Sequence, residues 1–173
     1  VSPNPANDYA VSKLAMEQMS QLWVERLPLF IVRPFNYTGV GQKEQFLIPK
    51  IIAHFWEKKP IIELGSLDVW REFGDVRAVV DIYRRLLEHC PVGNTLNVCT
   101  GQTHSLREVI ALCEKITGHS IEIQVNPEFI RTNEVRVLRG SSNRLNQEIG
   151  ELKSFCLEET LTWMLSNERL GAA

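Results

Sequence analysis

Tyr9 and Lys13, in the first predicted helix, have the residue types and the spacing of an acid/base pair. Residues four apart lie one above the other on an α-helix, so the phenol and the ammonium can face a common site. A tyrosine has an ordinary pKa near 10, and a neighbouring cation stabilises its phenolate. Lowering that pKa by about 3 units takes about 4 kcal/mol and suits the phenol to general acid/base catalysis. Ordinary amphipathic helices often contain the same spacing. The surrounding sequence therefore has to show whether Tyr9 and Lys13 form a catalytic pair.

The elements around this pair alternate between helix and strand. Asn7 or Asp8 can cap a helix that runs to about Arg26, and the apolar run 29–32 is typical of a buried parallel strand. Ser105 and Glu108 form a capping box, and Gly118 ends the helix that it opens. Further along we expect helices over 44–58, 75–89, 105–117, 142–149 and 157–165, and strands over 61–64, 95–99 and 121–125. In 75–89 the residues expected to face inward are Val76, Val79, Val80, Tyr83 and Leu87.

This alternation predicts an α/β fold. No internal repeat, low-complexity tract or linker divides residues 1–173, so we expect a single unit. The net charge of −2 argues against nucleic acid as a partner, and no apolar run approaches the roughly 20 residues that span a bilayer. The scattered histidines predict no metal site. The widely spaced cysteines predict reduced, mostly buried thiols in a cytoplasmic protein; they are Cys90, Cys99, Cys113 and Cys156.

Several motifs follow the Tyr9 helix in a fixed order. They are Arg33-Pro34-Phe35-Asn36-Tyr37, then Arg71-Glu72-Phe73-Gly74-Asp75-Val76-Arg77, then Leu96-Asn97-Val98, and then Arg131-Thr132-Asn133-Glu134. In this order they resemble the extended short-chain dehydrogenase/reductases that act on nucleotide sugars, the NAD-dependent epimerase/dehydratase family. The resemblance runs from Tyr9 to about Leu165 and is greatest to GDP-4-dehydro-6-deoxymannose reductases and GDP-mannose 4,6-dehydratases.

The resemblance implies the C-terminal part of a doubly wound Rossmann-like fold, together with the small substrate-binding α/β subdomain. It implies that Tyr9 is the catalytic acid/base, and that Lys13 tunes it and binds the nicotinamide ribose of NAD or NADP. Pro34, Asn36 and Tyr37 match the segment beside the nicotinamide, where Asn36 also reaches the substrate. The cofactor would exchange hydride with a sugar carbon while Tyr9 moves the proton.

The remaining matches imply a site for a nucleotide-diphosphate sugar. Arg71 and Arg131 match positions that bind the diphosphate, for which planar guanidinium groups are suited. Glu134 matches a carboxylate that accepts from the nucleoside ribose. Leu47 and Lys50 fall where the dehydratases contact guanine, although Lys50 also fits an ordinary surface lysine. The resemblance therefore favours a GDP-sugar.

Some features of the family pattern are changed or missing in this chain. Ala78 replaces a common aspartate, Thr132 a common proline and Tyr37 a histidine of the reductases. The glycine-rich turn that holds the cofactor pyrophosphate is absent, as is the Ser or Thr that precedes the catalytic tyrosine. We therefore expect an inactive fragment of a parent about twice this size. Its uncovered sheet and its Tyr9 helix favour self-association, for example as a homodimer.

Two alternatives stay open at this point. The chain could be a non-catalytic module that binds a nucleotide sugar or assembles with a partner. It could also come from an epimerase or dehydratase that acts on UDP- or dTDP-sugars. Reduction, dehydration and epimerisation are not distinguished by these residues.

Overall fold

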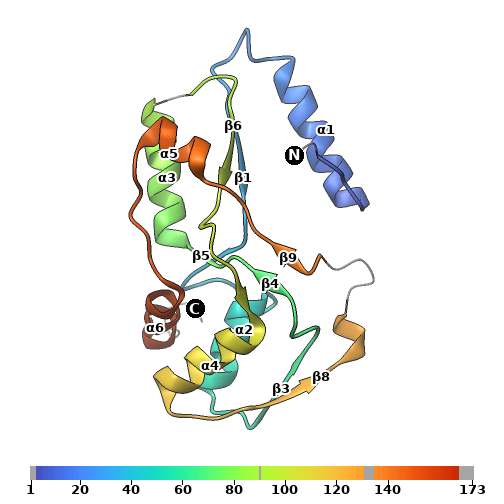
Figure 1. Cartoon of the computed structure of the whole chain (residues 1–173), viewed down its shortest axis with the longest axis vertical. Helices are drawn as coiled ribbons and strands as arrows, with labels where there is room; N and C mark the ends of the chain where they lie inside the picture. The colour runs from blue at the N-terminus through green and yellow to red at the C-terminus, as the bar shows by residue number, and fades with distance from the viewer. Residues whose placement is uncertain (1–2, 90, 131–134, 168–173) are drawn as a thin grey trace.

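In the computed structural model, which describes residues 3–89, 91–130 and 135–167, the fold is α/β, as expected (Figure 1). In the view of Figure 1 the upper part contains α1 (Asp8–Gln21), β1 (Ile31–Pro34), α3 (Val76–His89), β6 (Thr95–Val98) and α5 (Asn143–Ile149). The lower part contains α2 (Leu47–Trp56), β3 (Ile61–Leu64), α4 (Leu106–Thr117), β8 (Glu122–Val125), the 3₁₀ helix η1 (Pro127–Phe129) and α6 (Leu157–Asn167). Short strands join the two parts: β2 (Tyr37–Thr38), β4 (Trp70–Arg71), β5 (Gly74–Asp75), β7 (His104–Ser105) and β9 (Val137–Leu138).

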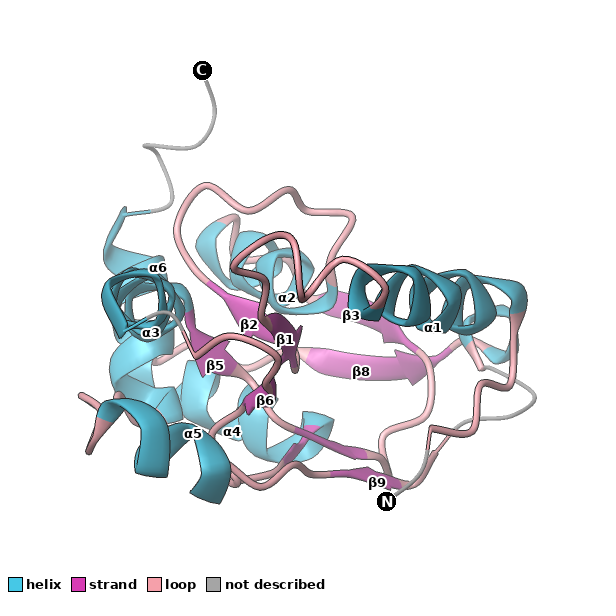
Figure 2. Ribbon diagram, turned by 90° about the horizontal axis from the view of Figure 1, so that it is seen from above, coloured by secondary structure: helices cyan, strands magenta, loops and turns pink. Residues whose placement is uncertain are grey.

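The upper part is built on a parallel pair of strands, β1 and β6, whose register runs from Ile31 opposite Thr95 to Pro34 opposite Val98. Helices α3 and α5 lie on one side of this pair and α1 on the other (Figures 1 and 2). Strand β1 begins two residues later than expected and is only half-buried. Within the described residues it has β6 as its one hydrogen-bonded neighbour, which leaves its other edge open.

The buried face of α3 differs from the sequence prediction. Val79, Ile82 and Leu86 face the core of the upper part, whereas Val80 is 62% exposed and Leu87 is 71% exposed. Val76 and Tyr83 are also not buried. Both sets recur at helical spacing, so the helix has two apolar stripes and periodicity alone cannot show which one meets the sheet.

The lower part packs α2, α4 and α6 around β3. Ser105 and Glu108 form the predicted capping box on α4, and Gly118 ends the helix in the left-handed region with φ 68°. Helix α2 begins at Leu47, later than expected, and Phe46 precedes it in an extended conformation. A proline has no N–H, so Pro49 fits the first helical turn, where N–H groups lack intrahelical acceptors. The helix could not begin much earlier without placing Pro49 in its interior.

An ion pair with a buried carboxylate fastens the start of α3 to α6. Arg77 Nη2 donates to Asp75 Oδ2 at 2.7 Å, and the Thr160 hydroxyl donates to the same oxygen at 2.8 Å. The Arg77 guanidinium lies 4.2 Å from the Phe155 ring centroid and 3.9 Å from that of Trp163. Burial acts to raise the pKa of Asp75, but the hydrogen bonds from Arg77 and Thr160 outweigh it and hold that pKa below its ordinary value.

We predict that Asp75→Asn lowers the free energy of unfolding by about 2 kcal/mol at pH 7, because it removes a buried, charged hydrogen-bond acceptor. A carboxyl group whose pKa is lowered in the folded state stabilises the fold above its unfolded pKa, about 3.9. This contribution is lost as pH falls through the lowered, folded value. Denaturant unfolding between pH 7 and pH 2 should therefore show the wild type and the variant converging in acid.

The matched control is Asp81→Asn, which removes a carboxylate that pairs with Arg84 and Arg85 on the surface of α3. Exposed pairs contribute little to stability, so this variant should change unfolding much less than Asp75→Asn does. An equal loss of unfolding free energy in the two variants would contradict this account of Asp75. So would a difference in unfolding free energy between wild type and Asp75→Asn that stays constant with pH.

Candidate functional site

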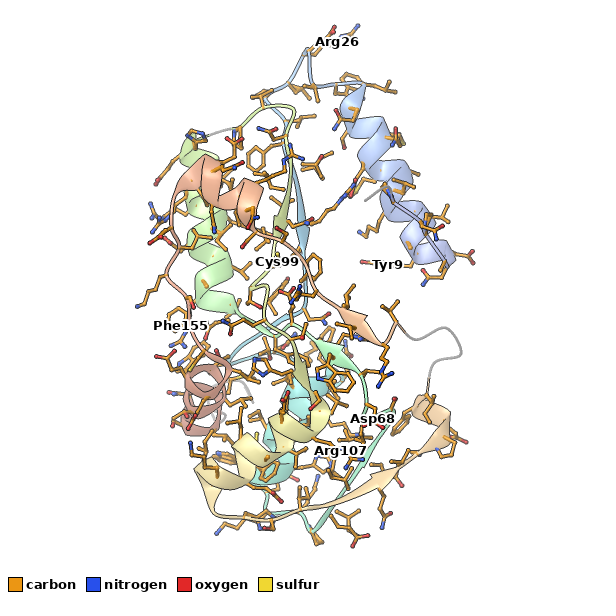
Figure 3. All side chains as sticks on the ribbon, in the orientation of Figure 1. Tyr9, Arg26, Asp68, Cys99, Arg107 and Phe155 are labelled. Atoms are coloured by element: carbon orange, nitrogen blue, oxygen red, sulfur yellow. The ribbon has the colours of Figure 1, made fainter. Side chains whose placement is uncertain are left out.

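Tyr9 and Lys13 lie at the start of α1. The Asn7 side chain caps this helix by accepting from the Ala10 N–H at 2.8 Å. Of the two residues that the sequence offered as caps, Asn7 and Asp8, the cap is therefore Asn7. Lys13 Nζ lies 5.4 Å from the Tyr9 ring centroid, one helical turn away, and Tyr9 is 71% exposed. Figure 3 shows Tyr9 at the end of α1 that is nearer to β9. Both groups are therefore close together and open to a ligand.

Helix α1 is attached to the fold by polar contacts rather than by a buried face. It ends at Gln21, earlier than the expected Arg26, and none of its residues is buried. Arg33 of β1 donates to Glu17 through Nε at 2.9 Å and through Nη2 at 2.5 Å. These hydrogen bonds raise the pKa of Arg33. The exposed apolar residues of α1 and of the turn after it are Val11, Met16, Met19, Leu22, Trp23 and Leu27.

Pro34 ends β1, and Asn36 and Tyr37 follow at the carboxyl end of this parallel strand; all three residues are exposed. The Asn36 carbonyl accepts from the Gly74 N–H at 2.8 Å, and Tyr37 pairs with Gly74. This pairing of β2 with β5 fixes the loop while leaving the Asn36 side chain available. Ligands of α/β proteins bind at this edge of the sheet.

A cavity of about 320 Å³ lies beside this loop, between α3, α5 and the segment 151–155. Asn36 and Tyr37 line it, but Tyr9 and Lys13 do not. Tyr9 and Phe155, which lines the cavity, lie on opposite sides of the molecule in Figure 3. The structure thus brings Asn36 and Tyr37 together at the cavity and keeps the acid/base pair apart from it.

Burial disfavours the thiolate form of Cys99 and of Cys113. Cys99, which lines the cavity, is half-buried, and burial raises its pKa to about 11, with a further contribution from Glu72. Burial raises the pKa of Cys113 to about 12. Cys156 is exposed, so the expectation of mostly buried thiols is wrong for that residue. Cys90 lies outside the described residues.

The residues expected to bind the nucleotide sugar lie on separate elements. Arg71 belongs to β4, and its Nη1 donates to Trp70 O at 2.9 Å. Leu47 is exposed on the first turn of α2. Lys50 Nζ donates to Glu63 O at 2.7 Å and lies 4.7 Å from the Phe129 ring centroid, so α2, β3 and η1 meet there. Arg131 and Glu134 lie outside the described residues.

Residues 1–99, more than half of the chain, match the model of the NAD dependent epimerase/dehydratase family. The chain belongs to this family. It is 37% identical to the GDP-6-deoxy-D-mannose reductase of Pseudomonas aeruginosa, over 95% of the chain and 57% of that enzyme. It is 35% identical to the GDP-6-deoxy-D-talose 4-dehydrogenase of Aggregatibacter actinomycetemcomitans, over 87% of the chain and 51% of that enzyme. The chain thus spans little more than half of these relatives.

Solved structures of the epimerase/dehydratase type share the fold. A crystal structure from Burkholderia cenocepacia J2315 superposes with a TM-score of 0.95 at 50% identity, covering 98% of this chain and 56% of that one. The structure of RMD from Pseudomonas aeruginosa, complexed with NADPH, superposes with a TM-score of 0.89 at 36% identity, over 98% of this chain and 59% of that one. The predicted family is confirmed, and so is an α/β fold of Rossmann type over about half of the relatives' length.

The sequence alone predicts no role for two residues near the site, Glu72 and Phe129. Glu72 lies within the run 71–77, and its carboxylate is buried. Phe129 is exposed beside Lys50, and its backbone passes so close to Gly65 that a Cβ there would meet Phe129 O at 2.6 Å. No group of three or more His, Cys, Asp or Glu among the described residues could hold a metal ion. In the same part of the chain no helix is long and apolar enough to cross a membrane.

We predict that the amides of α1 exchange their hydrogens at least about tenfold faster than those of α4, because α1 buries no residue and α4 buries four. Glu17→Gln should speed exchange in α1 further by weakening the contact with Arg33. Glu25→Gln, the same change beyond the end of α1, is the control and should have no such effect. Equal protection of α1 and α4 in hydrogen-exchange mass spectrometry would refute this description of α1.

Proposed function

We propose that the chain is the C-terminal part of an NAD(P)-dependent GDP-sugar enzyme, most nearly a GDP-4-keto-6-deoxymannose reductase. It would supply the acid/base pair and the nucleotide-sugar side of the active site. The observation that carries the proposal is the exposed Tyr9–Lys13 pair, one helical turn apart, within the segment that matches the family model. Two relatives, at 37% and 35% identity, act on GDP-6-deoxyhexoses, which supports the choice of a GDP-sugar.

The residues present fit one wall of a nicotinamide site. Tyr9 and Lys13 are exposed on the helix beside β1, and Pro34, Asn36 and Tyr37 follow the carboxyl end of that strand. When bound, the nicotinamide exchanges hydride with the sugar carbon. Lys13 binds the nicotinamide ribose and, as a cation, favours the phenolate form of Tyr9. Tyr9 gives its proton to the sugar oxygen during reduction, and the Asn36 side chain orients that sugar.

The nucleotide side of the site is formed by residues of the lower part and of β4. We propose that Arg71 and Arg131 bind the diphosphate and that Glu134 accepts from the ribose hydroxyls. Leu47 would pack on the base. Lys50 has three N–H donors and uses one on Glu63 O, so another can reach the keto oxygen of guanine.

The same proposal accounts for the exposed surfaces of the upper part. In a doubly wound fold both faces of the parallel sheet are covered, whereas here β1 has an open edge and α1 buries nothing. We propose that a dinucleotide-binding half, of about the size that the relatives have in addition, covers these surfaces and completes the cofactor site. The chain alone would then be inactive, and its apolar α1 would favour self-association, as in a homodimer.

A second candidate is a non-catalytic module that keeps only the nucleotide-sugar side. It is favoured by the separation of Tyr9 and Lys13 from the cavity that Asn36 and Tyr37 line. The sequence that precedes Val1 in the gene distinguishes the two candidates. A glycine-rich turn and a Ser or Thr some two dozen residues before Tyr9 support the enzyme, and their absence supports the module.

We predict that Tyr9→Phe, made in the full-length enzyme, lowers kcat by about 10²–10⁴-fold, because it removes a positioned proton donor. The dissociation constant for the GDP-sugar should change little, since the phenol acts on the reacting oxygen. Single-turnover oxidation of NADPH or NADH in the presence of GDP-4-keto-6-deoxymannose measures the rate.

Leu87→Ala changes a residue that is 71% exposed near the end of α3, and it serves as the control. It should leave the rate unaltered. If Tyr9→Phe turns over as fast as this control, Tyr9 has no part in the proton transfer and the proposed mechanism fails.

A further inference from the structure

Glu72 carries a buried carboxylate at the end of β4. The residue is 1% exposed, and its carboxylate accepts four hydrogen bonds. Oε2 accepts from the Thr100 N–H at 2.6 Å, from the Thr100 hydroxyl at 3.0 Å and from the Gly101 N–H at 3.1 Å. Oε1 accepts a short bond from the Gly140 N–H. Each of these donors is neutral, so Glu72 is bound by the backbone of two loops.

The two loops belong to the strands on either side of β4. The sheet has the order β7-β4-β9; Thr100 and Gly101 lead into β7, and Gly140 follows β9. Each strand is two residues long, so the ladders supply few hydrogen bonds. A carboxylate that accepts on both sides joins all three strands, and charge-assisted hydrogen bonds of this kind offset the cost of burying the charge.

Close packing makes the Gly140 side of this arrangement rigid. A Cβ on Gly140 would lie 2.7 Å from Cys99 Sγ and 2.7 Å from Phe35 Cζ. The backbone therefore approaches Glu72 through a space that only glycine fits. Packing against Cys99 and Phe35 therefore holds the Gly140 N–H at the Glu72 carboxylate, in addition to the hydrogen bond between them.

One of the strands joined by Glu72, β4, carries Arg71, which the proposed function places on the diphosphate. Arg71 is the neighbour of Glu72 on β4, and Arg71 Nη1 donates to Arg136 O at 3.4 Å. The Trp70 N–H also donates to Arg136 O, at 2.8 Å, and Arg136 directly precedes β9. On the other side, Gly74 of β5 donates to Asn36 O. Movement of β4 would thus displace the diphosphate side and the Asn36 loop together.

The geometry points to Glu72 as a positioning residue: its buried carboxylate joins β7, β4 and β9 and thereby sets where Arg71 meets a diphosphate. The inference rests on the proposed function, since that function supplies the diphosphate. Glu72 does not touch the nucleotide sugar itself. It acts through the backbone of the strands that do.

The test measures binding of GDP and of GMP to the 173-residue chain by isothermal titration calorimetry, in the wild type and in Glu72→Gln. Glutamine has the same shape, but it lacks the charge and turns an N–H₂ group toward backbone N–H donors. The affinity for GDP should fall about tenfold or more, while the affinity for GMP, which lacks the second phosphate, should fall much less. Gly140→Ala breaks the same contact from the other strand and should act in the same direction.

Val109→Ala is the control for a general loss of stability, because Val109 is fully buried in α4 and takes no part in the hydrogen bonds to Glu72. It should lower thermal stability and leave the ratio of GDP to GMP affinity unchanged. Hydrogen exchange of the Thr100, Gly101 and Gly140 amides should accelerate in Glu72→Gln and not in Val109→Ala.

The outcomes separate the inference from the function on which it rests. A wild-type chain that binds no GDP contradicts the proposed function, and the diphosphate role of Glu72 falls with it. A wild-type chain that binds GDP, with Glu72→Gln and Gly140→Ala lowering GDP and GMP affinity equally or not at all, overturns the positioning role alone. A loss confined to GDP in both variants, with Val109→Ala unaffected, supports it.

Discussion

The central strands of this protein depend on a buried carboxylate, because β4, β7 and β9 are each too short to form a stable sheet through their ladders alone. Glu72 accepts from backbone groups on both flanking strands, and the neighbouring Asp75 holds Arg77 between two aromatic rings. The hydrogen bonds to Glu72 fix β4, the strand that carries Arg71. The pair of Asp75 and Arg77 fastens α3 to α6. Polar contacts therefore help to connect the upper part of the fold to the lower part.

The helix that carries the proposed catalytic pair is held differently. Glu17 of this helix pairs with Arg33 of β1, and none of the residues of α1 is buried. We propose that a second half of the enzyme covers Tyr9 and Lys13 and excludes water from them, so that the chemistry is divided between two halves of one protein.

The sequence allowed the family, the α/β alternation and the local helix signals to be predicted. The strand 61–64 and the box formed by Ser105 and Glu108 were found because their signals lie within a few residues. The predicted buried face of α3 was wrong, because the helix has two apolar stripes and periodicity alone cannot show which one meets the sheet. Strands of two residues show no periodicity, and the role of Glu72 depends on donors that lie 28 and 68 residues away. Contacts of that kind are set by the fold and leave no local pattern.

The central claim is that this chain provides the nucleotide-sugar side of a GDP-sugar enzyme. The most direct measurement is a titration of the ¹⁵N-labelled chain with GDP-mannose, and in parallel with UDP-glucose, followed by two-dimensional NMR. The account predicts shifts that cluster at Leu47, Lys50 and Arg71 and that saturate at lower concentrations of GDP-mannose than of UDP-glucose. Shifts confined to the cavity beside α3, or the same response to both sugars, would contradict it.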